Sequence, residues 1–127
     1  MPNTFQNSAL VVVAHGDRDG EAKRVLVELV SELQMRHTQR RVEAAFLLAV
    51  PASMHLPHVI EMLLEEGYRR ITVMPWFLFA GPHVRKDIPE FLQSVRDQHA
   101  DLELTLLEPL GSDPILMDLL EARLAQV

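Results

Sequence analysis

Residues 9–16, with the sequence Ala-Leu-Val-Val-Val-Ala-His-Gly, decide how this chain folds. The first six are apolar and rich in valine, which is typical of a β-strand that is buried on both faces of a sheet. Three further runs of this kind occur at residues 42–50, 70–76 and 102–107. After each run, apolar residues recur at helical spacing, which predicts helices over residues 20–37, 51–67, 87–99 and 113–124.

This alternation of strands and helices predicts a single α/β domain over residues 1–127. We expect a three-layer sandwich around a four-stranded parallel sheet, with the strand order 2-1-3-4 and right-handed crossovers. Asp19 is the expected N-cap of the first helix, and Gly67 is expected just past the end of the second. The last helix should bury an apolar face made of Ile115, Leu116, Leu119, Leu120 and Leu124.

Composition excludes several classes of protein. A net charge of −6 argues against a binder of nucleic acid, because such affinity rests on clustered Lys and Arg. There is no cysteine, so any metal would be held by His, Asp, Glu or solvent. The first residues have no basic signal region, and the apolar run that follows is too short to cross a bilayer. We therefore expect a cytoplasmic protein with no membrane partner.

Two histidines follow neighbouring strands of the predicted sheet. His15 comes directly after the first strand, and His83 follows the third after a short loop. In sheets of this order the chain reverses direction between these strands, and ligands bind beyond their carboxyl ends. The two imidazoles should therefore meet at one site, as metal ligands or as bases near neutral pH. Taken singly, each could instead be a hydrogen-bonded structural residue.

Other polar groups lie near the same edge. His55 and His58 begin the second helix, whereas His37 and His99 lie near helix C-termini, where a structural or solvent-facing role is expected. The turn after His15 contains Asp17, whose carboxylate could cap the helix or reach a metal. Arg18 in that turn could bind a carboxylate of the substrate in bidentate fashion.

Residues 11–20, VVVAHGDRDG, and residues 73–90, VMPWFLFAGPHVRKDIPE, resemble two motifs of the small single-domain sirohydrochlorin chelatases of the CbiX/SirB type. This family belongs to the chelatase-like superfamily, which includes ferrochelatase. Weaker likeness in RVEAAFL and LEPLGSDPIL extends the resemblance over essentially the whole chain.

The resemblance implies insertion of a divalent metal, Co²⁺ or Fe²⁺ and in some relatives Ni²⁺, into sirohydrochlorin for cobalamin or siroheme synthesis. The metal is then a substrate, and no organic cofactor is implied. His15 and His83 carry over as the residues that bind metal and help to remove the pyrrole protons. Because larger relatives use two such domains facing one another, the resemblance also implies a homodimer.

The apolar loop at residues 76–82 suits a flat macrocycle with carboxylates on its rim. Phe79 and Gly81 would contact the macrocycle, and Arg18, Arg85 and Lys86 would pair with the carboxylates. The alternative is that the aromatic residues of this loop are core or dimer-interface residues.

Two positions depart from the family pattern. Asp17 stands where relatives have serine, and residues 48–53 lack the acidic residue that relatives usually place at the end of the second strand. His55 or Asp17 could replace that metal ligand, or the protein could bind metal or tetrapyrrole without catalysis. A phosphate or nucleotide binder of similar fold is poorly supported, because no glycine-rich phosphate loop follows the first strand.

Overall fold

The computed structural model describes residues 7–48 and 50–127, and its sheet has the expected order. The strands are β1 (Ser8–Ala14), β2 (Arg41–Phe46), β3 (Arg70–Pro75) and β4 (Glu103–Leu106). They form one sheet in the order β2-β1-β3-β4, and every neighbouring pair is parallel. The helices are α1 (Glu21–Arg36), α2 (Leu56–Glu65), α3 (Pro82–Gln98) and α4 (Ile115–Leu124), with short 3-10 turns at Ala52–Met54 and Leu110–Ser112. The predicted α/β architecture is confirmed.

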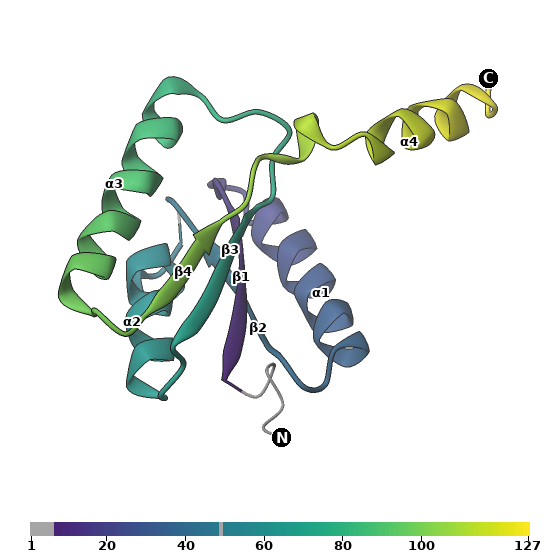
Figure 1. The fold of residues 1–127 in the computed structure, drawn as a ribbon. Helices are drawn as coiled ribbons and strands as arrows, with labels where there is room; N and C mark the ends of the chain where they lie inside the picture. Colours follow the sequence, from purple (N-terminus) through teal and green to yellow (C-terminus); the bar gives the residue numbers. More distant parts are fainter. Residues whose placement is uncertain (1–6, 49) are drawn as a thin grey trace.

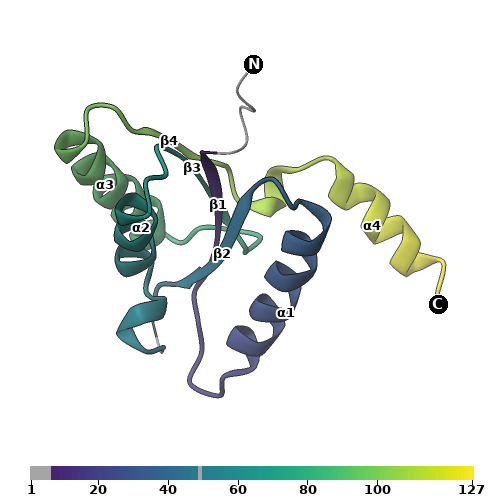
Figure 2. The ribbon, with the colours of Figure 1, turned by 90° about the horizontal axis from the view of Figure 1, so that it is seen from below.

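The central strand β1 joins two separate cores. All seven of its residues are buried, as the apolar run predicts. Val11 and Val13 pack with α2 and α3, whereas Leu10 and Val12 pack with α1 on the opposite face, because side chains alternate along a strand. Figure 2 shows α1 on one side of the sheet and α2 and α3 on the other.

Two helices begin at residues other than those expected. The N-cap of α1 is Gly20 and not Asp19, since the chain enters this helix with a left-handed φ of 78°. Asp17 takes the capping role instead, with its Oδ2 atom accepting a hydrogen bond from the Ala22 amide at 3.2 Å. The helix α3 begins at Pro82 and not at Asp87, because proline suits the first helical turn, where its missing N–H leaves no bond unmade. Gly67, with φ 97°, ends α2 as predicted.

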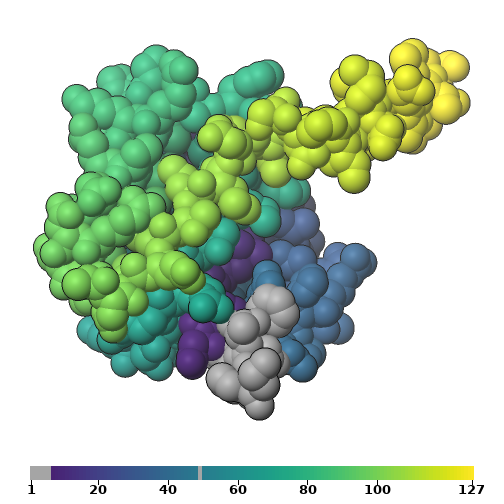
Figure 3. Space-filling model, viewed as in Figure 1, coloured from purple at the N-terminus to yellow at the C-terminus, as the bar shows by residue number. Residues whose placement is uncertain are grey.

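The helix α4 departs most from expectation. It projects from the body of the protein in Figures 1 and 3, and none of its residues is buried. The expectation that the helix buries an apolar face is therefore wrong for a single chain. No helix among the described residues has the length and apolar character needed to cross a membrane.

Candidate functional site

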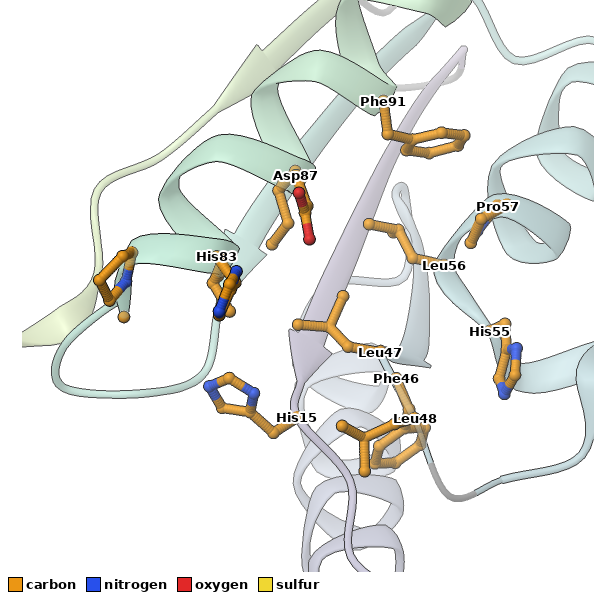
Figure 4. A pocket seen from close by; sticks show the side chains of 14 residues that line it. His15, Phe46, Leu47, Leu48, His55, Leu56, Pro57, His83, Asp87 and Phe91 are labelled. Atoms are coloured by element: carbon orange, nitrogen blue, oxygen red, sulfur yellow. The ribbon is translucent and has the colours of Figure 1, made fainter.

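A cavity of about 610 Å³ opens at the carboxyl edge of the sheet. This volume lies within the usual range of small-molecule sites. Figure 4 shows its walls, which come from the end of β1, the end of β2 and the first turns of α2 and α3. Its polar side chains are those of His15, His55, His83 and Asp87, and the rest of the lining is glycine or apolar: Phe46, Leu47, Leu48, Leu56, Pro57, Gly81, Pro82, Val84, Ile88 and Phe91.

His15 is held in place by its neighbours. Its ring packs against Phe77, with centroids 4.9 Å apart and an interplanar angle of 38°. Its carbonyl accepts a hydrogen bond from the Leu48 amide at 2.9 Å. At Gly16, where φ is 91°, a Cβ would lie 2.1 Å from the Leu48 carbonyl oxygen. Glycine after the histidine is therefore required for this close approach of the two strand ends.

His83 and Asp87 project from the same side of α3. They lie four residues apart, which is about one helical turn, and both line the cavity. Figure 4 shows the Asp87 carboxylate on the same wall of the cavity as His83. Sequence reasoning missed Asp87 because it began this helix too late. The signal was present as the spacing His-x-x-x-Asp directly after Gly-Pro.

His55 stands on the other side of the cavity from His15 and His83 in Figure 4. Its backbone caps α2 and bridges to Phe46, and its Nε2 atom is buried without a hydrogen-bond partner. His58 does not line the cavity. His37 and His99 are the C-cap residues of α1 and α3, in agreement with the expected positions at helix C-termini.

The end of β2 offers the cavity only apolar side chains. Leu47 and Leu48 line it where relatives were expected to carry an acid, and Ala49 lies outside the described residues. Asp17 does not line the cavity, since its carboxylate faces the start of α1. Over residues 7–48 and 50–127, no three His, Asp or Glu side chains gather closely enough to hold a metal.

The loop beside the cavity is apolar and exposed. Phe79 is 79% exposed and Leu78 is 52% exposed. The loop backbone is fixed, because the amides of Leu110 and Gly111 donate hydrogen bonds to the carbonyls of Phe77 and Leu78 at 3.0 and 2.9 Å. Phe79 and Leu78 therefore form an exposed apolar surface beside the cavity, on a loop whose backbone is held by hydrogen bonds.

Three cationic side chains follow the cavity histidines within three residues in the sequence. Arg18, Arg85 and Lys86 are exposed, and among the described residues none of them is in an ion pair. Arg85 follows His83 by two residues and so leaves α3 on the far side from the cavity, whereas Lys86 lies closer to the His83 side. Their charges are therefore open to an anionic partner.

Comparisons with known proteins agree with one another. The CbiX family model matches residues 9–127. A sirohydrochlorin cobaltochelatase of Methanocaldococcus jannaschii is 28% identical, over 88% of this chain and 94% of that protein. A sirohydrochlorin ferrochelatase of Priestia megaterium is 30% identical over 91% of this chain, which spans only 43% of that longer protein.

Solved structures share the fold. A putative cobalamin biosynthesis CbiX protein from Marinobacter aquaeolei superposes with a TM-score of 0.73, at 24% identity, over 94% of this chain and 99% of that one. The sirohydrochlorin chelatase SirB from Bacillus subtilis in complex with cobalt gives a TM-score of 0.77 at 20% identity. In that case this chain covers 50% of the solved chain.

Proposed function

Because the chain belongs to the CbiX family, we propose that it inserts Co²⁺ or Fe²⁺ into sirohydrochlorin. The observation that supports this most strongly is the position of His15 and His83. They follow different strands of the sheet, yet both line one cavity at its carboxyl edge. This is the edge at which doubly wound sheets bind their ligands.

The reaction needs bases as well as metal ligands. Metal insertion replaces two pyrrole N–H bonds of the macrocycle by metal–nitrogen bonds, and it releases two protons. Neutral imidazole can bind a divalent metal and can accept a proton near neutral pH. We assign both roles to the pair formed by His15 and His83, each accepting one proton as the metal moves to the macrocycle nitrogens.

The metal should be held weakly before transfer. The described residues contain no cluster of three metal-binding side chains, so two imidazoles leave the remaining coordination positions to water and macrocycle nitrogens. We assign to Asp87, one turn from His83 and on the same cavity, the role of stabilising the imidazolium that proton transfer creates. His55, on the opposite wall, and Asp17, which caps α1, are both less favoured as a further ligand, because the described residues bring no three metal-binding side chains together.

The surroundings suit an acidic macrocycle. Its flat apolar faces would lie against Phe79 and the backbone at Gly81, and its carboxylates would pair with Arg18 and Lys86. Arg85 is the less favoured partner, because it leaves α3 on the far side from the cavity. We propose that no organic cofactor takes part, since ligand exchange and proton transfer complete the reaction. Whether Ni²⁺ is also accepted is an outcome of the assay.

We propose further that this single cytoplasmic domain acts as a homodimer. The chain spans 94% of the methanogen cobaltochelatase but 50% of the chloroplastic ferrochelatase of Arabidopsis thaliana. A relative of twice the length could contain two such domains, and a dimer of this chain would contain the same number of domains.

The test is an insertion assay. Purified protein is incubated with sirohydrochlorin and, separately, Co²⁺, Fe²⁺ or Ni²⁺, and the change in visible absorption is followed against protein-free reactions. We expect acceleration with Co²⁺ or Fe²⁺. Stoichiometric binding of metal or tetrapyrrole without turnover would instead support a binding module, and no acceleration with any metal would refute the enzyme assignment.

A further inference from the structure

The ends of β1 and β3 bring His15 and Phe77 side by side. Val13 pairs with Pro75 in the parallel ladder between these strands, and the Trp76 amide donates a hydrogen bond to the Val13 carbonyl at 2.6 Å. His15 and Phe77 each come two residues after a member of this pair, so their side chains leave the sheet on the same face. Their rings pack together with centroids 4.9 Å apart, a separation typical of aromatic pairs.

The backbone of His15 is fixed, so rotation of the side chain is what can move the imidazole. The Leu48 amide donates a hydrogen bond to the His15 carbonyl at 2.9 Å, and the preceding carbonyl accepts one from Leu47 at 3.1 Å. The His15 side chain is exposed, and within the described part of the chain no hydrogen bond holds its ring. Metal-binding histidines usually have such a bond, which sets the direction of the ring. Here the Phe77 ring restricts the imidazole instead.

Phe77 is itself held in place from the side of β4. The Leu110 amide donates a hydrogen bond to the Phe77 carbonyl at 3.0 Å. The next residue, Gly111, lies so close to Leu78 that an added Cβ would be 2.2 Å from the Leu78 carbonyl oxygen. The Phe77 side chain is half-buried and packs against the core on the α2 and α3 side of the sheet. The ring therefore gives His15 a fixed surface.

Phe77 stands behind the cavity wall. His15 lines the cavity and Phe77 does not, so Phe77 can influence a ligand there through the imidazole that it contacts. Figure 4 shows the His15 imidazole on the same side of the cavity as His83. A rotation of the His15 ring away from His83 would separate the ring nitrogens that a shared metal needs.

We propose that Phe77 is a positioning residue, which holds the His15 imidazole in the direction needed to share a metal ion with His83. An imidazole without this contact would sample other directions, and metal binding would have to restrict it at an entropic cost. Loss of the ring should therefore weaken metal binding and slow metal transfer, while contacts with the macrocycle stay the same. The inference rests on the proposed function, because it takes His15 and His83 as the metal-binding pair.

Calorimetric titration with Co²⁺ alone tests this role in the purified protein. We expect Phe77→Leu to raise the Kd for Co²⁺ about tenfold, as is common when a group that orients a metal ligand is lost. Phe77→Tyr keeps an aromatic ring, so its Kd should stay within about twofold of the wild-type value. Weaker binding in His15→Ala with unchanged binding in Phe77→Leu would overturn the proposal. Unchanged binding in His15→Ala would instead refute the assignment of the metal-binding pair.

The matched control is Tyr68→Leu, which removes an aromatic ring at the other end of β3. Tyr68 is half-buried and packs against the same core as Phe77. Tyr68→Leu and Phe77→Leu should therefore lower the urea midpoint to a similar extent, but Tyr68→Leu should bind Co²⁺ as the wild type does. Equal weakening of Co²⁺ binding in both variants would show that lost core packing is the cause, and would overturn the proposal.

The insertion assay separates positioning from contact with the macrocycle. Because Phe77 does not line the cavity, we expect Phe77→Leu to lower kcat about tenfold and to leave the KM for sirohydrochlorin unchanged. A raised KM with unchanged kcat would overturn the proposal. If the wild type inserts no metal but its Co²⁺ affinity depends on Phe77 as expected, the enzyme assignment alone is refuted.

Nuclear Overhauser measurements on the metal-free wild type test the contact without a substitution that could impair folding. We expect cross-peaks between the imidazole protons of His15 and the ring protons of Phe77, because the two rings pack together. His15→Gln identifies the imidazole signals. Absence of these cross-peaks would show that the Phe77 ring does not hold His15 in solution, and would overturn the proposal.

Discussion

The two edges of the sheet use their charged residues differently. At the amino edge, Arg41 pairs with Glu43 and Glu66 at 2.8 and 3.0 Å, and Arg70 pairs with Glu103 at 2.6 Å. At the carboxyl edge, His15, His83 and Asp87 line an open cavity, and among the described residues none of these three side chains is in an ion pair. The charged pairs at the amino edge are thus engaged in structure, whereas the ionisable side chains that line the cavity remain available to a ligand.

Electrostatics at the amino edge favour the charged forms. Burial lowers the pKa of Arg41, but the hydrogen bond with Glu43 and the charges of Glu43 and Glu66 raise it overall above its ordinary value. Because the pKa of Arg41 is higher in the folded than in the unfolded state, its ion pairs contribute full stability at all pH values below the unfolded pKa, and this contribution is lost only as the pH rises through the folded pKa. This contribution should therefore be constant across the physiological pH range and sensitive to salt.

The largest effects should come from the histidines of the carboxyl edge. We expect His15→Ala and His83→Ala each to lower the insertion rate by about 100-fold or more, the usual range for loss of a general base. Both side chains are exposed, so the free energy of unfolding should change by less than about 1 kcal/mol. Rates and urea midpoints are measured on the same samples.

The matched control for this pair is His99→Gln, because His99 is the C-cap of the helix that carries His83 on its first turn. Its rate should stay at the wild-type value. If His15→Ala, His83→Ala and His99→Gln all lowered the insertion rate equally, the histidines of the cavity would have no special role in the reaction.

A substitution at Gly16 should mainly reduce stability. In Gly16→Ala, the new Cβ would meet the Leu48 carbonyl in a left-handed backbone conformation, and we expect a loss of about 2 kcal/mol or more. Gly20→Ala is the control, since φ is 78° there but no atom lies within 4 Å of the added carbon. It should cost about 1 kcal/mol. Equal costs in urea denaturation would show that the approach of Gly16 to Leu48 is not a tight constraint.

Asp87 should matter to the reaction less than the histidines. We expect Asp87→Asn to lower the insertion rate by about tenfold, as is common when a residue that supports a ligand or base is changed. Glu90→Gln, on the same helix but outside the cavity, should leave the rate unchanged. If the two variants have equal rates, Asp87 does not support His83.

The smallest effect is expected at the amino edge. Arg41→Gln should lower the free energy of unfolding by up to about 1 kcal/mol, with an unchanged insertion rate, because pairs this exposed are worth little. The loss should shrink in 1 M salt, where charges are screened over about 3 Å. Lys23→Gln serves as the control, since Lys23 is in no ion pair within the described part of the chain. A large fall in insertion rate for Arg41→Gln would mean that the two edges are coupled.

The sequence predicts the sheet and the histidine pair because both depend on local pattern plus topology. The apolar run of β1 identifies the central strand, and alternation with helices brings His15 and His83 to one edge. Asp87 was missed because proline and glycine at residues 81–82 were interpreted as a loop when they begin α3. The exposure of α4 could not be predicted, because apolar spacing indicates that a helix tends to be buried but does not show whether the rest of the chain covers it.

We propose that His15 and His83 form one metal-transfer site. Its most direct test is the anomalous scattering of Co²⁺ in crystals of the wild-type protein. We predict a peak about 2.1 Å from a ring nitrogen of each of these two histidines, a distance typical of metal–imidazole bonds. A Co²⁺ peak only at His37, His58 or His99, or none at saturating metal, would contradict the account.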